Sequence, residues 1–108
     1  MSVNKKLSPN KPLTPEQRKF LSGLAHSIKP SVLVGKDGLC DGLMKEISNA
    51  INSHELIKIK FNKSKDNKTE LLDSISEKLG IHLVAQIGNI GILFRQAEKT
   101  EDRKIKLR

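Results

Sequence analysis

The residues best suited to chemistry form two Gly-x-x-Gly segments, GKDG at residues 35–38 and GNIG at residues 88–91. Glycines let the backbone of another molecule come close, because no Cβ atom stands in the way. A lysine between the glycines adds a positive charge and donors for phosphate, whereas GNIG carries no charge. GKDG therefore points to binding of a polyanion, and GNIG to chain reversal between two strands.

The surroundings of GKDG strengthen this interpretation. It follows the apolar run SVLV (31–34), which we expect to be a buried strand, and it precedes a predicted amphipathic helix at about residues 41–53. Backbone N–H groups at a helix start are unpaired and partly positive, which suits phosphate. Asp37 would repel phosphate, so we expect it to cap the helix or shape the turn. A purely structural turn is the alternative.

Patterns for catalysis and metal binding are weak by comparison. The three histidines lie far apart and Cys40 is the single cysteine, so we expect no metal, no cofactor and no intrachain disulfide. His54 beside Glu55 could serve acid–base chemistry, but a structural role at a helix-to-strand junction is favoured. A reactive Cys40 at a helix start is the less favoured alternative to an incidental substitution. Nucleophile elbows, Walker loops and dinucleotide fingerprints do not occur, so we expect neither an enzyme nor a small-molecule substrate.

The charge balance favours an anionic partner. Twenty Lys and Arg residues stand against twelve Asp and Glu in 108 residues, a formal net charge of +8. Residues 1–13 contribute +3, residues 14–95 another +3 and residues 96–108 the remaining +2. This balance suits RNA or DNA, with simple solubility as the alternative. The three phenylalanines are the whole aromatic content and are expected in the core, so phosphate contacts should outweigh base stacking.

Hydrophobic periodicity predicts the elements that must position these groups. A capping box and Pro15 predict a helix that starts after Thr14 and stops before Pro30. A second helix follows GKDG, and a third is closed by Gly80. Strands are expected at residues 31–34, 55–61, 82–87 and 92–95. This order predicts an α/β fold of two layers, a mixed four-stranded sheet packed with three helices, whose last hairpin is antiparallel. The strand order stays open.

The predicted strand at residues 55–61, ELIKIKF, supplies a basic surface. Because strand side chains alternate, one face should be covered and the other should carry lysines. The covered face is expected to hold Ile57, Ile59 and Phe61, and the basic face Leu56, Lys58 and Lys60. The lysines that could converge on one rim of the sheet are Lys29, Lys36, Lys58 and Lys60.

The expected organisation is a single folded domain with two charged ends. Residues 14–95 form the domain, residues 1–13 a flexible basic arm, and residues 96–108 a charged C-terminal tail. No run approaches the roughly 18 apolar residues that span a bilayer, and the N-terminus lacks the apolar segment of a secretory signal. We expect a cytoplasmic monomer without membrane contact.

Several of these motifs occur together in a known family. GLAHSIKPSVLVGKDGL (23–39) followed by HELIKIKF (54–61) resembles the CRM domain, the chloroplast RNA splicing and ribosome maturation family, in its stand-alone bacterial, YhbY-like form. The resemblance extends over about residues 14–107. It implies a fold similar to the C-terminal domain of translation initiation factor three, an RNA-binding role, and association with precursors of the large ribosomal subunit. The RNA-binding residues that it implies are Gly35, Lys36, Asp37 and Gly38 in the loop, with Lys29, Lys58, Lys60 and Arg95 on the basic surface.

The chain departs from the family pattern at two positions. Cys40 stands where a threonine is usual, so helix capping is expected to pass to Asp41 or Asp37. Phe94 replaces a usual tyrosine and so removes its hydroxyl group. The favoured function is an RNA-binding ribosome-assembly factor. The alternative is a protein-interaction adaptor that docks on a ribosomal protein and uses its glycine loop only as a turn.

Overall fold

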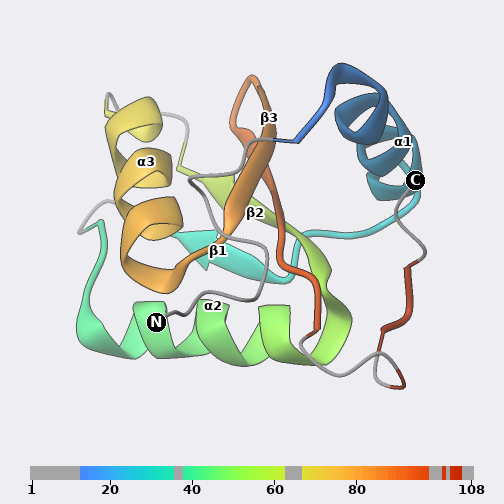
Figure 1. The fold of residues 1–108 in the computed structure, drawn as a ribbon. Helices are drawn as coiled ribbons and strands as arrows, with labels where there is room; N and C mark the ends of the chain where they lie inside the picture. Colours follow the sequence, from blue (N-terminus) through green and yellow to red (C-terminus); the bar gives the residue numbers. More distant parts are fainter. Residues whose placement is uncertain (1–12, 36–37, 63–66, 98–100, 102, 106–108) are drawn as a thin grey trace.

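A computed structural model describes residues 13–35, 38–62, 67–97, 101 and 103–105 (Figure 1). The predicted order of elements is confirmed: α1 (Pro15–Ala25), β1 (Val32–Val34), α2 (Asp41–His54), β2 (Leu56–Phe61), α3 (Lys68–Leu79), β3 (His82–Ile87) and β4 (Ile90–Phe94). β4 starts two residues earlier than the periodicity predicted, because the turn that precedes it consists only of Gly88 and Asn89. The arm predicted at residues 1–13 lies outside the described residues except for Leu13, which is buried against α1.

Local signals account for the helix ends. The Thr14 hydroxyl oxygen accepts a hydrogen bond from the Gln17 N–H at 3.0 Å, and the Gln17 side-chain oxygen accepts one from the Thr14 N–H at 2.9 Å. This reciprocal pair confirms the predicted capping box. α3 ends at Gly80, whose φ of 64° is the left-handed conformation that glycine adopts without strain.

The four strands form one mixed sheet in the order β1-β2-β4-β3. β1 is parallel to β2, while β4 is antiparallel to both β2 and β3. Val34 at the end of β1 therefore lies beside Phe61 at the end of β2. The Phe61 N–H donates to the Asn89 carbonyl at 2.8 Å, which brings the β3–β4 turn to the same place. We call this edge, where β1 and β2 end and the hairpin turns, the turn end of the sheet.

The helices cover the two faces of the sheet unequally. α2 and α3 pack on one face, where the predicted inward residues of β2, Ile57, Ile59 and Phe61, are buried. α1 packs on part of the other face, over Leu56 and Phe94. The two layers expected from the sequence are thus the sheet with α2 and α3, and α1 adds a partial cover on the opposite side (Figure 1).

Glu55 is a buried acid that joins the start of β2 to the C-terminal segment. Its side chain is 1% exposed and its φ is 64°, a conformation that costs free energy for any residue with a Cβ atom. One carboxylate oxygen accepts from the N–H of Ala97 at 2.7 Å, and the other accepts from Lys104 at 2.8 Å and Ile105 at 3.0 Å. Ile105 packs beside α1. The described part of the predicted tail is therefore attached to the domain, and Glu55 has the structural role that the sequence favoured.

We expect Glu55→Gln to destabilise the fold by about 1–3 kcal/mol, because the amide keeps the size of the carboxylate but removes an acceptor from buried N–H groups. The fall in the free energy of unfolding is measured by urea denaturation. Glu101→Gln at an exposed position is the control and should change stability by less than about 0.5 kcal/mol. Equal effects of the two variants would refute the anchoring role of Glu55.

Candidate nucleic-acid interface

The GKDG turn begins directly after β1, at the turn end. The Gly38 N–H donates to the Gly35 carbonyl at 3.1 Å, and Gly38 has a φ of 77° that requires glycine or a strained residue. Gly35 has no such requirement, since its φ is not left-handed and a Cβ atom there would meet nothing within 4 Å. The backbone angle thus explains Gly38, while the contacts of the described residues give no structural reason for Gly35. Lys36 and Asp37 lie outside the described residues.

The second glycine segment, GNIG, is accounted for by folding alone. Gly88 has a φ of 58° in the two-residue turn, as tight hairpins demand. A Cβ atom on Gly91 would come within 2.6 Å of a Leu72 methyl carbon. Both glycines therefore have a reason inside the chain, which agrees with the predicted role in chain reversal.

Two helix starts face the turn end. The N-cap of α2 is Cys40, whose side chain makes no capping hydrogen bond, and Asp41 is the first residue inside the helix. Asp41 is therefore not the cap, because the helix begins at Asp41 itself, one residue earlier than an Asp41 cap requires. The other expected cap, Asp37, lies outside the described residues. α3 starts after Asn67, also without a side-chain cap, and Lys68 donates to the Asn89 side chain in the hairpin turn. Helix starts carry partial positive charge, so this end of the sheet favours an anion.

The lysines of β2 lie on the face that α2 and α3 leave free. Lys60 is exposed and is paired with Leu33 of β1. Leu33 precedes Gly35 by two residues. Lys58 is half-buried and one step further from the turn end. Lys29 is exposed but precedes β1, so it lies toward the other end of that strand. The fold thus brings Lys60 and Lys58 toward the glycine loop and sets Lys29 apart from it.

Arg95 is engaged by the fold. Its guanidinium donates to the Leu79 carbonyl at 2.8 Å and to the Asn52 side chain, so it ties the end of α3 to α2. Its backbone N–H donates to the Glu55 carbonyl at 2.8 Å, at the start of β2 and hence away from the turn end. A direct contact of Arg95 with RNA stays a prediction, and its demonstrated contacts are structural.

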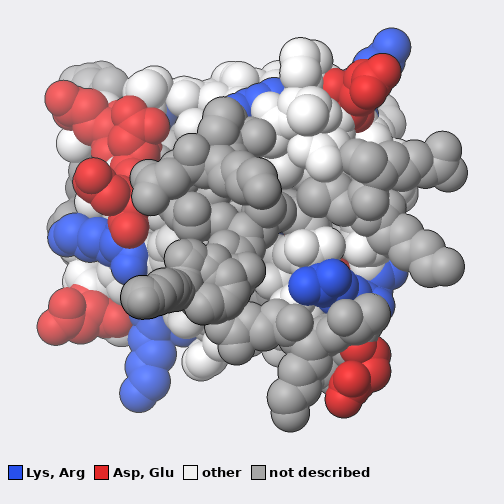
Figure 2. Space-filling view, viewed as in Figure 1, with Lys and Arg blue, Asp and Glu red and all other residues white. Residues whose placement is uncertain are grey.

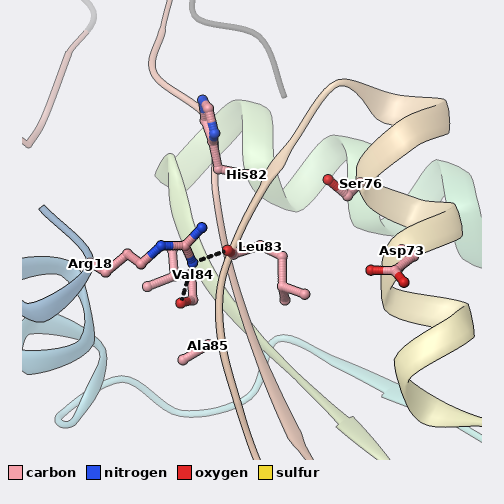
Figure 3. A pocket seen from close by; sticks show the side chains of 7 residues that line it. All are labelled: Arg18, Asp73, Ser76, His82, Leu83, Val84 and Ala85. Carbon is pink, nitrogen blue, oxygen red and sulfur yellow. Dashed lines mark hydrogen bonds between the residues drawn. The ribbon is translucent and has the colours of Figure 1, made fainter. Parts of the chain in front are cut away.

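A cleft of about 340 Å³ lies along the edge strand β3, between α1 and α3 (Figure 3). Arg18 of α1 reaches across it and donates to the carbonyls of Leu83 and Val84 at 2.8 and 2.9 Å. The β3–β4 register shifts at this point, and unpaired edge carbonyls invite pairing with other chains. Arg18 covers them. Ser76, which also lines the cleft, donates to the Ile81 carbonyl, so these side chains hold the fold together.

His82 lines the same cleft and is 4% exposed, and its Nε2 atom has no hydrogen-bond partner. Burial, followed by the positive charge of Arg18, lowers the pKa of His82 below its ordinary value of 6.5. At a pH between the two values the unfolded chain binds more protons than the folded chain, so lowering the pH favours unfolding.

We therefore expect the free energy of unfolding to fall as the pH decreases through about 6.5 and to level off below the folded pKa of His82. His82→Gln, which cannot titrate, should show a smaller fall over that interval in urea denaturation at a series of pH values. His26→Gln at an exposed position is the control. Parallel pH curves for the wild type and His82→Gln would contradict the assignment.

Two further properties concern the described ranges only. Within them, His, Cys, Asp and Glu side chains do not gather in any group of three that could hold a metal ion. The same ranges contain no helix with the length and apolar character needed to cross a membrane.

Known proteins with similar sequences identify the family. The CRS1/YhbY (CRM) domain matches residues 13–95. The chain belongs to this family. Among CRM relatives, an RNA-binding protein of Haemophilus influenzae is 38% identical over 90 residues, which cover 82% of this chain and 91% of the relative. A Bacillus subtilis relative, named a probable RNA-binding protein, is 31% identical over 96 residues, covering 88% and 98% of the two chains.

A solved structure has the same fold. The solution structure of a hypothetical Staphylococcus aureus protein, which is itself only proposed to bind RNA, superposes with a TM-score of 0.75 at 32% identity. The match covers 89% of this chain and 99% of that one. The family resemblance and the α/β fold predicted from the sequence are therefore confirmed.

One exposed residue of the CRM domain's sheet was missed by the sequence pattern. SVLV was expected to be wholly buried, but only Val32 and Val34 are, while Leu33 is 69% exposed on the lysine-bearing face. In a run of apolar residues, alternation between faces leaves no signal in residue type. The strand pairing, which sets Leu33 opposite Lys60, shows the exposed position.

Proposed function

We propose that this protein binds RNA through phosphate contacts at the turn end and acts as a ribosome-assembly factor on ribosomal RNA in precursors of the large subunit. The observation that carries the proposal is Gly35, an exposed glycine that neither backbone angle nor packing requires. A position without a side chain directly after β1, two residues beyond the partner of Lys60, suits close approach of a phosphate backbone.

Charge and family membership support the same function. The net charge of +8 attracts polyanions over long range. The relatives from Haemophilus influenzae and Bacillus subtilis carry RNA binding in their names. The ribosomal role rests on the resemblance to stand-alone bacterial CRM proteins. Binding of this kind needs no catalytic group, cofactor or second subunit, and we propose a non-enzymatic, cytoplasmic monomer.

Gly35→Asp should weaken RNA binding by about tenfold or more, which corresponds to about 1.4 kcal/mol, because it adds bulk and negative charge where phosphate approaches. Fluorescence anisotropy with labelled ribosomal RNA fragments measures the loss. Gly23→Asp is the matched control, since Gly23 is exposed on α1 and a Cβ atom there also meets nothing within 4 Å. Gly38 is unsuited to this test, because any side chain there is strained at a φ of 77°. Equal loss in both variants would show that charge alone matters and would overturn the loop assignment.

Sedimentation of tagged protein from cell extracts tests the ribosomal role. The wild type should travel with large-subunit precursors and folded Gly35→Asp should stay at the top of the gradient. RNase treatment should release the wild type, whereas an adaptor bound to a ribosomal protein would keep its partner after the RNA is digested. Retention after digestion would therefore favour the adaptor and count against the proposed function.

A further inference from the structure

An exposed apolar row crosses the lysine-bearing face of the sheet near the turn end. The strand register sets Leu33 of β1 beside Lys60 of β2, Lys60 beside Ile90 of β4, and Ile90 beside Ile87 of β3. Directly paired residues share a face, so these four side chains form one line across the sheet. We call this line the apolar row. Leu33 is 69% exposed, Ile87 is 63% exposed and Ile90 is half-buried.

The apolar row stands out among the described residues. Among the described residues, three large hydrophobic side chains are exposed. Two of them, Leu33 and Ile87, belong to the row. The third, Leu24, is 38% exposed on α1. α1 covers the neighbouring positions of the same face, including Ile92 and Phe94, but leaves the row open. Exposed apolar groups gathered on the uncovered part of a face, beside Lys58 and Lys60, indicate a contact surface.

The charges around the row select its partner. Lys60 lies inside the row and Lys58 borders it, so a partner must tolerate positive charge at the centre of an apolar contact. The exposed acids of α3, Glu70, Asp73 and Glu77, lie on the opposite side of the sheet, and Figure 2 shows acidic side chains gathered where α3 lies. An unpaired stretch of RNA fits this combination, because its bases offer apolar faces and its phosphates offer negative charge.

We infer that the apolar row is a base-contacting platform for single-stranded RNA, on which Leu33, Ile90 and Ile87 pack against unpaired bases while Lys60 holds the adjoining phosphates. The inference rests on the proposed function and deepens it, since it names the class of RNA. The row spans about 14 Å at the usual spacing of neighbouring strands. Four-stranded sheets in other RNA-binding folds accommodate two or three bases. Here aliphatic side chains take the place of the aromatic platforms that this chain lacks.

The test compares two probes, a labelled 12-nucleotide single-stranded RNA and a fully paired duplex of the same sequence, over a series of salt concentrations. The variant Leu33→Ser with Ile87→Ser should lose about tenfold in affinity for the single strand, in line with the effect of removing a base contact. Its affinity for the duplex should stay within about twofold, because paired bases cannot reach the row. Leu24→Ser, an exposed leucine off the row, should match the wild type on both probes.

The salt dependence separates base contacts from phosphate contacts. Apolar contacts with bases do not release counterions when the RNA binds. The double variant should therefore keep the wild-type slope of log affinity against log salt. Lys60→Gln should instead reduce the slope on single strands by about 0.7, the value of one phosphate contact. Leu33→Phe enlarges the platform and should preserve or increase single-strand affinity, which a merely structural role would not explain.

The outcomes distinguish the inference from the function on which it rests. If Gly35→Asp loses affinity and the double variant does not, the RNA-binding function stands and the platform is overturned. If the double variant loses both probes equally while circular dichroism confirms folding, the row does not discriminate single strands and the inference also fails. If the wild type binds neither probe, the proposed function fails first. Unchanged RNA affinity together with loss of a protein partner would assign the row to that protein instead.

Discussion

The parallel pairing of β1 with β2 is the constraint on which the rest of the structure depends. Because the two strands run in the same direction, both end at one edge of the sheet, and the helices that follow them start there. The antiparallel β4 then brings the hairpin turn to that edge as well. A single pairing therefore gathers the glycine loop, two electropositive helix starts and the apolar row, which are far apart in the sequence.

The same pairing explains why the two faces of the sheet differ. A crossover helix between parallel strands must pack on one face, and α2 does so together with α3. Among the described helices, α1 is the one that packs on the other face, and it covers that face in part. The exposed residues of that face are Leu33 of β1, Lys60 of β2 and Ile87 at the end of β3, which are aliphatic or basic. Exposure on this face is thus a consequence of topology and not of residue type.

The predictability of each feature follows from the range of the interactions that determine it. Helix starts and ends depend on neighbours three or four residues away. The start of α1 at the Thr14–Gln17 capping box and the end of α3 at Gly80 could therefore be predicted from the sequence. The burial pattern of β2 could be predicted from the sequence because isoleucine alternates with lysine. The strand order depends on contacts between distant segments, and no local pattern encodes it. For the same reason the exposed Leu33 and the attachment of the C-terminal segment to Glu55 became visible only in the fold.

The contacts of Glu55 have a consequence for how this family member can change over time. Among the described residues, its carboxylate accepts hydrogen bonds from three backbone N–H groups of the C-terminal segment. Because the donors are backbone N–H groups, these hydrogen bonds do not depend on the residue type at each position. Proline is the exception, since it lacks the N–H. The side chains of Ala97 and Lys104 can therefore be replaced while their hydrogen bonds to Glu55 are kept, whereas Ile105 also packs beside α1 through its side chain. Substitutions at positions held only through their backbone can thus change the surface chemistry of the protein without loss of this attachment.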